Sequence, residues 1–340
     1  IEAGLLGDGS IYALDGLSAT GLRARRWLNE LPAQSASRIS ATMGDMDPVA
    51  LDWAMRCHEE FLPEHGEGEL LPHLGDLRKS VLEHGRHWVD IDPYGSPLPF
   101  LDTAIQSLAR RGVAEISATD SAALTGSSKN ALLRRYGARV RTDGLAHDSG
   151  LRVLLATVAR TAARHERSIE PLLSIWESHH LRVSVRVLRS IERANDVESS
   201  LGWRVASPTI EEVSSSIESG LQPETLLDSL PMHCFLPLSH PVDRSDKRIS
   251  GPMWTGPMGQ TEAMVSMTEE RALELCAPSA IEDDPVGWLE KDFEYERRRV
   301  ARSVRHISDE AGVIDAPHLI LVDELASWLG SGSPPSPKSM

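Results

Sequence analysis

The chain has 340 residues, which is enough for two domains that each bury a core of their own. Its 50 acidic and 35 basic residues give a formal net charge of −15, which argues at first sight against nucleic-acid binding. No apolar run reaches the roughly 18 residues of a membrane span. Three isolated cysteines exclude a disulfide framework and a Cys-x-x-C zinc site. We therefore expect a cytoplasmic protein without membrane contact or metal, with a monomer as the default.

The first predicted unit is a strand near Tyr12, a glycine-containing loop and a helix over residues 22–29. Asp15 ends the strand, and Gly16 and Gly21 allow the backbone to approach a ligand closely. The loop lacks the full G-x-G-x-x-G pattern of dinucleotide-binding proteins. Taken alone, it fits an ordinary strand-to-helix turn equally well.

Two further acidic residues follow later elements. A strand over residues 38–43 precedes Asp45, which lies about 20 or more residues past the glycine loop, where a carboxylate can bind ribose hydroxyls. A helix over residues 49–60 comes next. Asp76 then precedes a short helix, and its position suits the amino group of an adenine. A helix N-cap is an equally good interpretation of Asp76.

The most informative motif is Asp-Pro-Tyr-Gly-Ser-Pro at residues 92–97, which directly follows an apolar strand at residues 88–91. An acidic residue, a proline and an aromatic ring form the motif by which many S-adenosylmethionine-dependent methyltransferases hold a planar amino group. The Asp92 carboxylate and the Pro93 carbonyl can accept its N–H groups, and Tyr94 can stack on the base. A nicotinamide dehydrogenase offers no explanation for this motif.

Strands and helices alternate along the first half of the chain. They predict an α/β fold in which residues 1–166 form a class I, Rossmann-like methyltransferase sheet. A helix over residues 99–111, a strand near Ile116 and a helix over residues 151–165 complete this domain. Its mainly parallel sheet would gather the acidic residues at one edge.

A smaller α+β domain is expected over residues 167–330. It begins with strands within residues 169–187, where arginine and serine alternate with valine. We expect a mixed sheet, a charged helix over residues 286–310, and a disordered tail over residues 331–340.

Several blocks in this order resemble the tRNA guanine-26 N2-dimethyltransferase family. The likeness extends from about residue 11 to about residue 260 and rests on residues 17–23, 90–97, 117–120, 133–136, 147–154, 169–172 and 251–257. The Asp-Pro-Tyr-Gly-Ser-Pro and Gly-Pro-Met-Trp blocks are far more specific than the glycine loop. Accidental agreement of so many ordered blocks is improbable.

The resemblance implies transfer of methyl groups from S-adenosyl-L-methionine to N2 of guanosine 26 in tRNA, giving N2-methyl- and N2,N2-dimethylguanosine. It also implies two sets of contacts, to the methyl donor by Arg23, Asp45, Asp76 and Leu77, and to the target guanine by Asp92, Pro93 and Tyr94. The family's N-terminal Asn-Pro-x-Met segment and its last C-terminal block have no counterpart here. We therefore expect a chain truncated at both ends.

Two other functions fit the same scaffold. An adenine-N6 methyltransferase shares the sheet, but usually carries a second proline where Tyr94 stands. A non-catalytic RNA-binding module on a methyltransferase scaffold would not bind S-adenosylmethionine.

Arginine dominates residues 110–193 although the chain is acidic overall. This segment predicts a track for the phosphates of tRNA, with the domain at residues 167–330 as the tRNA-binding part and no role for DNA. The alternative is a set of solvated helix and strand faces.

Overall fold

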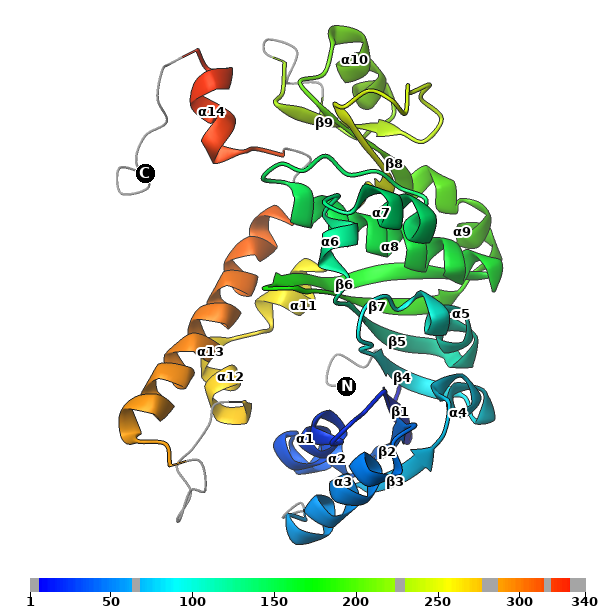
Figure 1. Ribbon diagram of the computed structural model, residues 1–340, viewed down its shortest axis with the longest axis vertical. Coiled ribbons are helices and arrows are strands. Elements are labelled where there is room, and N and C mark those ends of the chain that lie inside the picture. Colours follow the sequence, from blue (N-terminus) through cyan, green and yellow to red (C-terminus); the bar gives the residue numbers. More distant parts are fainter. Residues whose placement is uncertain (1–5, 63–67, 224–229, 277–286, 315–318, 331–340) are drawn as a thin grey trace.

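The computed structural model describes residues 6–62, 68–223, 230–276, 287–314 and 319–330. A seven-stranded sheet occupies the centre of an elongated molecule, and a three-stranded sheet lies towards one end (Figure 1). The expected disordered tail at residues 331–340 lies outside the described residues.

The large sheet has the strand order β3-β2-β1-β4-β5-β7-β6. Its strands are β1 (Ile11–Gly16), β2 (Ile39–Asp45), β3 (Glu69–Leu74), β4 (Arg86–Ile91), β5 (Leu108–Ala118), β6 (Arg167–Glu177) and β7 (His180–Arg189). β1 to β5 pair in parallel, whereas β7 runs antiparallel to both β5 and β6. The predicted Rossmann-like sheet is confirmed.

Alternating side chains of the parallel strands supply two separate cores. In β1, Leu14 packs with buried residues of α4, α5 and α8, whereas Ala13 packs with residues of α1 and α3 on the other face. Successive side chains of a strand point to opposite faces of the sheet. Both faces are therefore apolar, as expected for a parallel sheet covered by helices.

The helices of the first half are α1 (Leu22–Glu30), α2 (Ala33–Ala36), α3 (Pro48–Glu60), α4 (Leu77–Glu83), α5 (Leu98–Ser107), α6 (Ser121–Leu124), α7 (Lys129–Tyr136) and α8 (Ala146–Arg164). The predicted helix over residues 99–111 was wrong at its end, because Leu108 and Arg111 pair with β4 and β7 as part of a strand. The helix predicted from residue 151 begins at Ala146. It accommodates Gly150, at which a Cβ atom would meet Leu181 at 2.9 Å.

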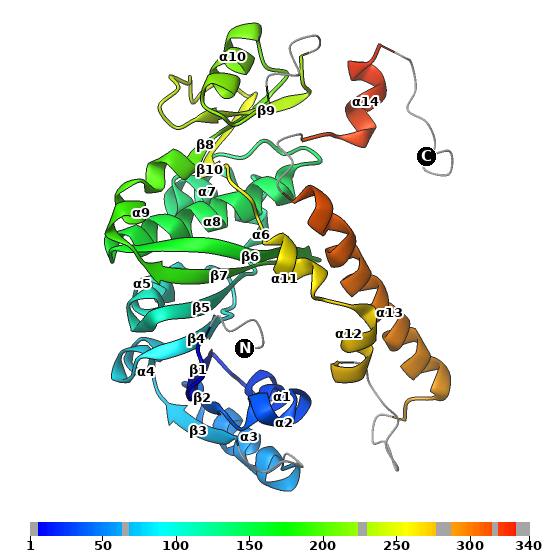
Figure 2. The same cartoon turned by 180° about the vertical axis from the view of Figure 1, so that it is seen from behind.

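The second sheet consists of β8 (Leu201–Ala206), β9 (His233–Pro237) and β10 (Ile249–Trp254) in the order β10-β8-β9. Both pairings are antiparallel, so the prediction of a mixed sheet was wrong. The remaining helices of the described chain are α9 (Ile191–Asn195), η1 (Val197–Ser200), α10 (Ile210–Glu218), α11 (Thr261–Val265), α12 (Glu269–Leu275), α13 (Glu290–Glu310), η3 (Ala311–Val313) and α14 (Val322–Trp328), of which α10 packs against β9. α13 packs against α11 and α12 along one side of the molecule (Figure 2).

The strands at residues 169–187 do not belong to a second sheet. β7 pairs with β5 from Arg111↔Leu188 to Ala118↔Leu181, and β6 pairs with β7. A boundary near Glu166 therefore falls within the large sheet. The smaller sheet begins only at β8.

Candidate active site

A cavity of about 910 Å³ lies outside the carboxyl ends of β1, β2 and β4. β1 pairs with β2 on one side and with β4 on the other. The order in which successive strands are added to the sheet therefore reverses between β1 and β4. Ligands of open α/β sheets bind at such a switch point. The cavity brings together six of the predicted site residues, Asp15, Arg23, Asp45, Asp92, Pro93 and Tyr94.

Three carboxylates lie side by side across the sheet beside this cavity. Asp15 of β1 is in register with Asp90 of β4, and Asp90 is in register with Glu115 of β5. All three are buried, and all three lie on the face covered by α1. Neighbouring strands are only about 4.8 Å apart, so three negative charges in a row require compensation.

Two arginines supply that compensation. Arg23 Nη1 lies 2.9 Å from Asp90, and its Nη2 lies 2.5 Å from Asp92 Oδ2. Arg182 of β7 binds Asp90 and, through Nε at 3.2 Å, Glu115. The four carboxylates of this network, including Asp92, exceed the two guanidinium groups by two. The site therefore has a formal charge of −2 and favours a cationic ligand.

Asp15 is the least compensated member of the row. Its Oδ2 accepts the amide of Ala24 at 3.1 Å, while Oδ1 is buried without a hydrogen bond and lies 3.5 Å from Arg23. Burial, reinforced by Asp90, raises the pKa of Asp15 from 3.8 to about 7. A buried acceptor at a cavity wall is suited to a ligand that donates hydrogen bonds.

We expect the Asp15→Asn variant to lose much of the pH dependence of stability that we predict for the unaltered chain. The folded-state pKa of Asp15 is raised, so its contribution is full below its unfolded value of 3.8 and is lost as the pH rises through about 7. The free energy of unfolding should fall by a few kcal/mol between about pH 5 and about pH 8. Denaturant unfolding at both pH values measures this. Asp47→Asn, at the exposed cap of α3, should keep the unaltered slope; an equal slope in Asp15→Asn would contradict the assignment.

The loop after β4 is held from behind and open in front. The Gly95 amide donates to Thr119 Oγ1 at 2.6 Å, and Gly95 has a φ of 92°, which strongly favours glycine. Ser96 Oγ lies 2.9 Å from the Tyr136 hydroxyl, which in turn donates to Asp120. Tyr94, by contrast, is fully exposed at the cavity mouth. The loop therefore presents the exposed Tyr94 ring to whatever enters the cavity, from a backbone that is hydrogen-bonded at Gly95.

The other predicted ligand contacts have mixed positions. Asp45 lines the cavity, and its carboxylate accepts the amides of Ala19 at 2.7 Å and Asp47 at 2.9 Å. A carboxylate has about four acceptor sites, so capacity remains for a ligand. Gly21 caps α1 with a φ of 63°, and a Cβ atom there would meet Met43 at 2.1 Å.

Four predicted residues are not among those that line the cavity, namely Gly21, described above, and Gly16, Asp76 and Leu77. Leu77 is buried against Gly16, where an added Cβ atom would lie 2.8 Å from the leucine side chain. Asp76 caps α4 by accepting the amide of Arg78 and pairs with that arginine, which lowers its pKa to about 2. The contacts of Asp76 are therefore those of a helix N-cap, as one of its two interpretations predicts. The ligand roles of Asp76, Leu77 and Gly16 stay predictions.

Comparison with known proteins identifies the family to which this chain belongs. The model of the N2,N2-dimethylguanosine tRNA methyltransferase family matches residues 6–339. The chain belongs to this family. Within it, the tRNA (guanine(26)-N(2))-dimethyltransferase of Thermoplasma acidophilum is 37% identical over 191 residues, covering 56% of this chain and 52% of that protein. The Caenorhabditis elegans protein of the same name is 36% identical over 201 residues, or 57% of this chain and 37% of its own.

Structural comparison agrees for the fold. Trm1 from Pyrococcus horikoshii, solved in complex with S-adenosyl-L-methionine, matches with a TM-score of 0.71 and 23% identity, over 94% of this chain and 76% of that one. The chain spans about half the length of several curated family members that it matches. Among the described residues, each helix is too short or too polar to traverse a bilayer. Those residues also contain no cluster of three or more His, Cys, Asp or Glu side chains arranged for a metal ion.

Sequence reasoning missed part of the site of this family member. Asp90 was read only as an element of the strand, Glu115 was not singled out, and Arg182 was assigned to a phosphate track. The sequence could have predicted Asp90 as a site residue, because it lies two residues before Asp92 and side chains two residues apart in an extended chain point to the same side. The partnership of Glu115 and Arg182, which are 67 residues apart in the sequence, depends on the pairing of β5 with β7.

Proposed function

We propose that this chain is an S-adenosylmethionine-dependent methyltransferase that methylates N2 of guanosine 26 in tRNA. One observation carries the proposal: the Asp92 carboxylate and the fully exposed Tyr94 ring flank the mouth of a cavity with excess negative charge. Its relatives carry the name tRNA (guanine(26)-N(2))-dimethyltransferase. Family membership and site geometry support the same reaction.

The cavity residues fit S-adenosylmethionine. The buried acceptor Asp15 Oδ1 suits its ammonium group, the remaining acceptor capacity of Asp45 suits ribose hydroxyls, and the formal charge of −2 suits a donor with a net positive charge. When bound, this cofactor supplies the methyl group from a sulfonium. Arg23, Gly21 and the predicted Gly16, Asp76 and Leu77 complete the proposed binding set.

The exocyclic nitrogen of guanine is a poor nucleophile, because its lone pair is delocalised into the ring. Asp92 can correct this. Its Oδ2 is bound by Arg23, whereas no hydrogen bond to Oδ1 occurs among the described residues. Oδ1 can therefore accept one N–H of the amine and the Pro93 carbonyl another, which directs the lone pair and stabilises the developing positive charge.

Asp92 can also take the proton that the nitrogen must release. After one methylation one N–H remains, so one of these two contacts can still orient the nitrogen for a second round. Tyr94 would stack on the base, which must first leave its place in the tRNA. The part of the chain beyond β7 would contribute to tRNA binding, and we place the reaction in the cytoplasm.

The test is transfer of labelled methyl from S-adenosylmethionine to two tRNA transcripts, with guanosine or adenosine at position 26. We expect label in the first transcript alone, with a product that digestion identifies as N2-methyl- or N2,N2-dimethylguanosine. Equal label in both would contradict the target. Label in neither, together with no heat of S-adenosylmethionine binding in calorimetry, would favour a non-catalytic RNA-binding module.

A further inference from the structure

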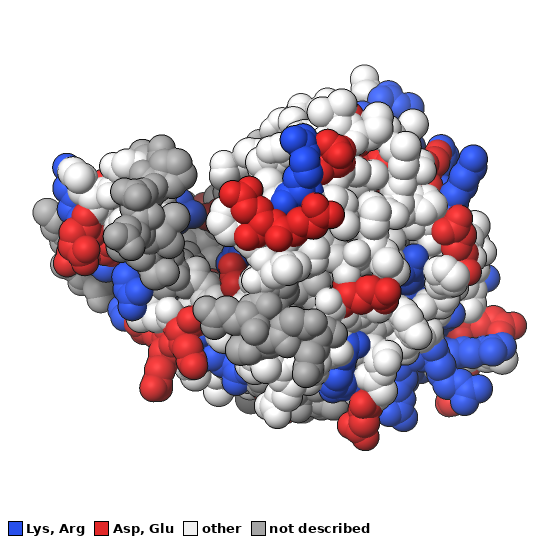
Figure 3. Space-filling view, turned by 90° about the horizontal axis from the view of Figure 1, so that it is seen from below, with Lys and Arg blue, Asp and Glu red and all other residues white. Residues whose placement is uncertain are grey.

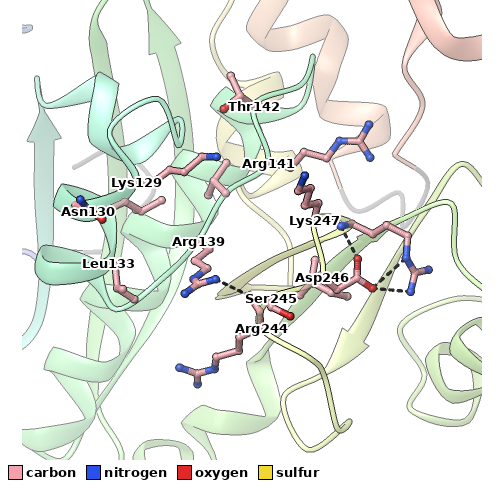
Figure 4. A pocket seen from close by; sticks show the side chains of 14 residues that line it. Lys129, Asn130, Leu133, Arg139, Arg141, Thr142, Arg244, Ser245, Asp246 and Lys247 are labelled. Atoms are coloured by element: carbon pink, nitrogen blue, oxygen red, sulfur yellow. Dashed lines mark hydrogen bonds and ion pairs between the residues drawn. The ribbon is translucent and has the colours of Figure 1, made fainter.

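A second cavity, of about 730 Å³, lies between the first turn of α7, residues 139–142 and the loop at residues 244–249. Its walls carry six cationic side chains, those of Lys129, Arg139, Arg141, Arg244, Lys247 and Arg248, and one acidic side chain, Asp246. Figure 4 shows Lys129, Arg139 and Arg141 beside Arg244 and Lys247, although Arg139 and Arg244 are 105 residues apart in the sequence. The cavity is separate from the candidate active site in its lining residues.

The acid of this cavity is already neutralised. Asp246 binds Arg248 at 2.8 Å, Arg248 also binds Glu212 at 3.1 Å, and Arg141 lies 3.3 Å from Asp143. The other four cations, Lys129, Arg139, Arg244 and Lys247, are exposed and have no carboxylate within ion-pair distance among the described residues.

The arginines on and near β7, by contrast, are paired with acidic side chains. Arg186 and Arg193 bind Glu170, Arg189 binds Glu166, and Arg182 belongs to the acidic row. These arginines of the predicted phosphate track are therefore compensated by acids, whereas Arg139 and Arg141 of the same predicted segment line the second cavity. On the lower face of the molecule as drawn in Figure 1, basic and acidic side chains are likewise interspersed (Figure 3). Uncompensated positive charge gathers instead at the second cavity.

The cationic side chains are held in place by the backbone around them. Arg139 donates to the carbonyl of Arg244 at 2.7 Å, and its main chain exchanges two hydrogen bonds with Gly251. The Arg244 guanidinium lies over the Trp203 ring at 5.4 Å. Two remote segments are thereby joined, so the cations are presented together before any ligand arrives.

α7 connects this cavity to the active-site loop. Lys129 is the first residue of α7 and lines the cavity. Tyr136 is the last residue of α7, and its hydroxyl is hydrogen-bonded to Ser96 of the Asp-Pro-Tyr-Gly-Ser-Pro loop. Seven residues of helix rise by about 10 Å. A polyanion in the cavity thus lies within a few nucleotides of a base at Tyr94.

We propose that this cavity binds backbone phosphates of tRNA on one side of the target nucleotide. The inference rests on the proposed function and adds a site to it. Arginine forks and lysine ammonium groups are the usual ligands of phosphate oxygens. The lining contains no aromatic residue on which a base could stack, which favours the backbone over a base as the occupant.

The test compares two double variants of the full chain. Arg244→Gln/Lys247→Gln removes two cavity cations, and Arg56→Gln/Lys79→Gln removes two exposed cations of α3 and α4, which lie outside residues 110–193 and outside the linings of both cavities. Both lower the net charge equally. Affinity for a tRNA transcript is measured by fluorescence anisotropy over a range of salt, together with methyl-transfer kinetics.

We expect the cavity variant to raise Kd and KM for tRNA by about tenfold and to reduce the salt slope by about two. Its kcat at saturating tRNA and its affinity for S-adenosylmethionine should stay unchanged, and the control should change little. Equal losses in the two variants would overturn the inference. So would tight binding of inorganic phosphate in calorimetry with unchanged tRNA affinity, which would indicate a small-anion site.

The two proposals fail in different ways. If the unaltered chain methylates the guanosine transcript but the two double variants lose equal affinity for tRNA, only the assignment of the second cavity is refuted. If the unaltered chain neither binds nor methylates either transcript, the proposed function fails and the cavity assignment fails with it.

Discussion

The Asp92→Asn variant should lose methyl transfer by about a thousandfold or more in kcat, because a positioned base contributes about 10² to 10⁴ and lone-pair orientation adds to it. Asparagine keeps the shape of the side chain. Its amide cannot, however, accept the released proton or balance the developing positive charge on the nitrogen. Single-turnover transfer to the guanosine transcript measures the effect.

Binding of S-adenosylmethionine separates this role from a general loss of the site. Calorimetry should give a Kd for Asp92→Asn close to that of the unaltered chain, because Asp15 and Asp45 remain. Asp52→Asn, on the exposed face of α3, serves as a matched control with normal turnover. Near-normal turnover in Asp92→Asn would refute the assignment of Asp92.

The Arg182→Met variant should be destabilised by about 3 to 5 kcal/mol at about pH 8, since it leaves Asp90 and Glu115 buried without their main cation. Burial already raises the pKa of both carboxyls, and loss of Arg182 raises it further. A raised folded-state pKa gives stability that is lost as the pH rises. The loss should therefore be smaller at about pH 5.

Denaturant unfolding at the two pH values measures this difference. Arg189→Met, which removes an exposed arginine of the same strand paired with Glu166, should cost no more than about 1 kcal/mol. An identical loss at both pH values in Arg182→Met would show that the variant acts through packing and not through charge.

Features encoded within a short stretch of chain could be predicted. The strands at Tyr12, Ile39 and Val89 are buried apolar runs, and the Asp-Pro-Tyr-Gly-Ser-Pro loop carries its chemistry in consecutive residues. Asp15, Asp45 and Asp92 end neighbouring strands, and parallel pairing brings these ends together. The sequence therefore sufficed for the centre of the site.

Features that depend on residues far apart in the sequence, such as the extent of a strand and the pairing of charges, could not be predicted in the same way. Leu108 to Arg111 extend a strand because β4 and β7 lie beside them, although their local pattern continues a helix. Composition likewise counts arginines but does not reveal that Arg186 pairs with Glu170, while Arg244 has no carboxylate within ion-pair distance among the residues that the structure describes. Compensation of charge is a property of the fold.

The acidic row across β1, β4 and β5 also determines which part of a nucleotide can enter the crevice. A phosphate at 4 Å from one unbalanced carboxylate would be repelled by about 4 kcal/mol at the effective dielectric of a protein surface. A nucleobase has no net charge and meets no such barrier. In the proposed reaction, the crevice would therefore favour entry of the uncharged base over the sugar-phosphate chain, so that the acidic row of the sheet would itself orient the incoming nucleotide.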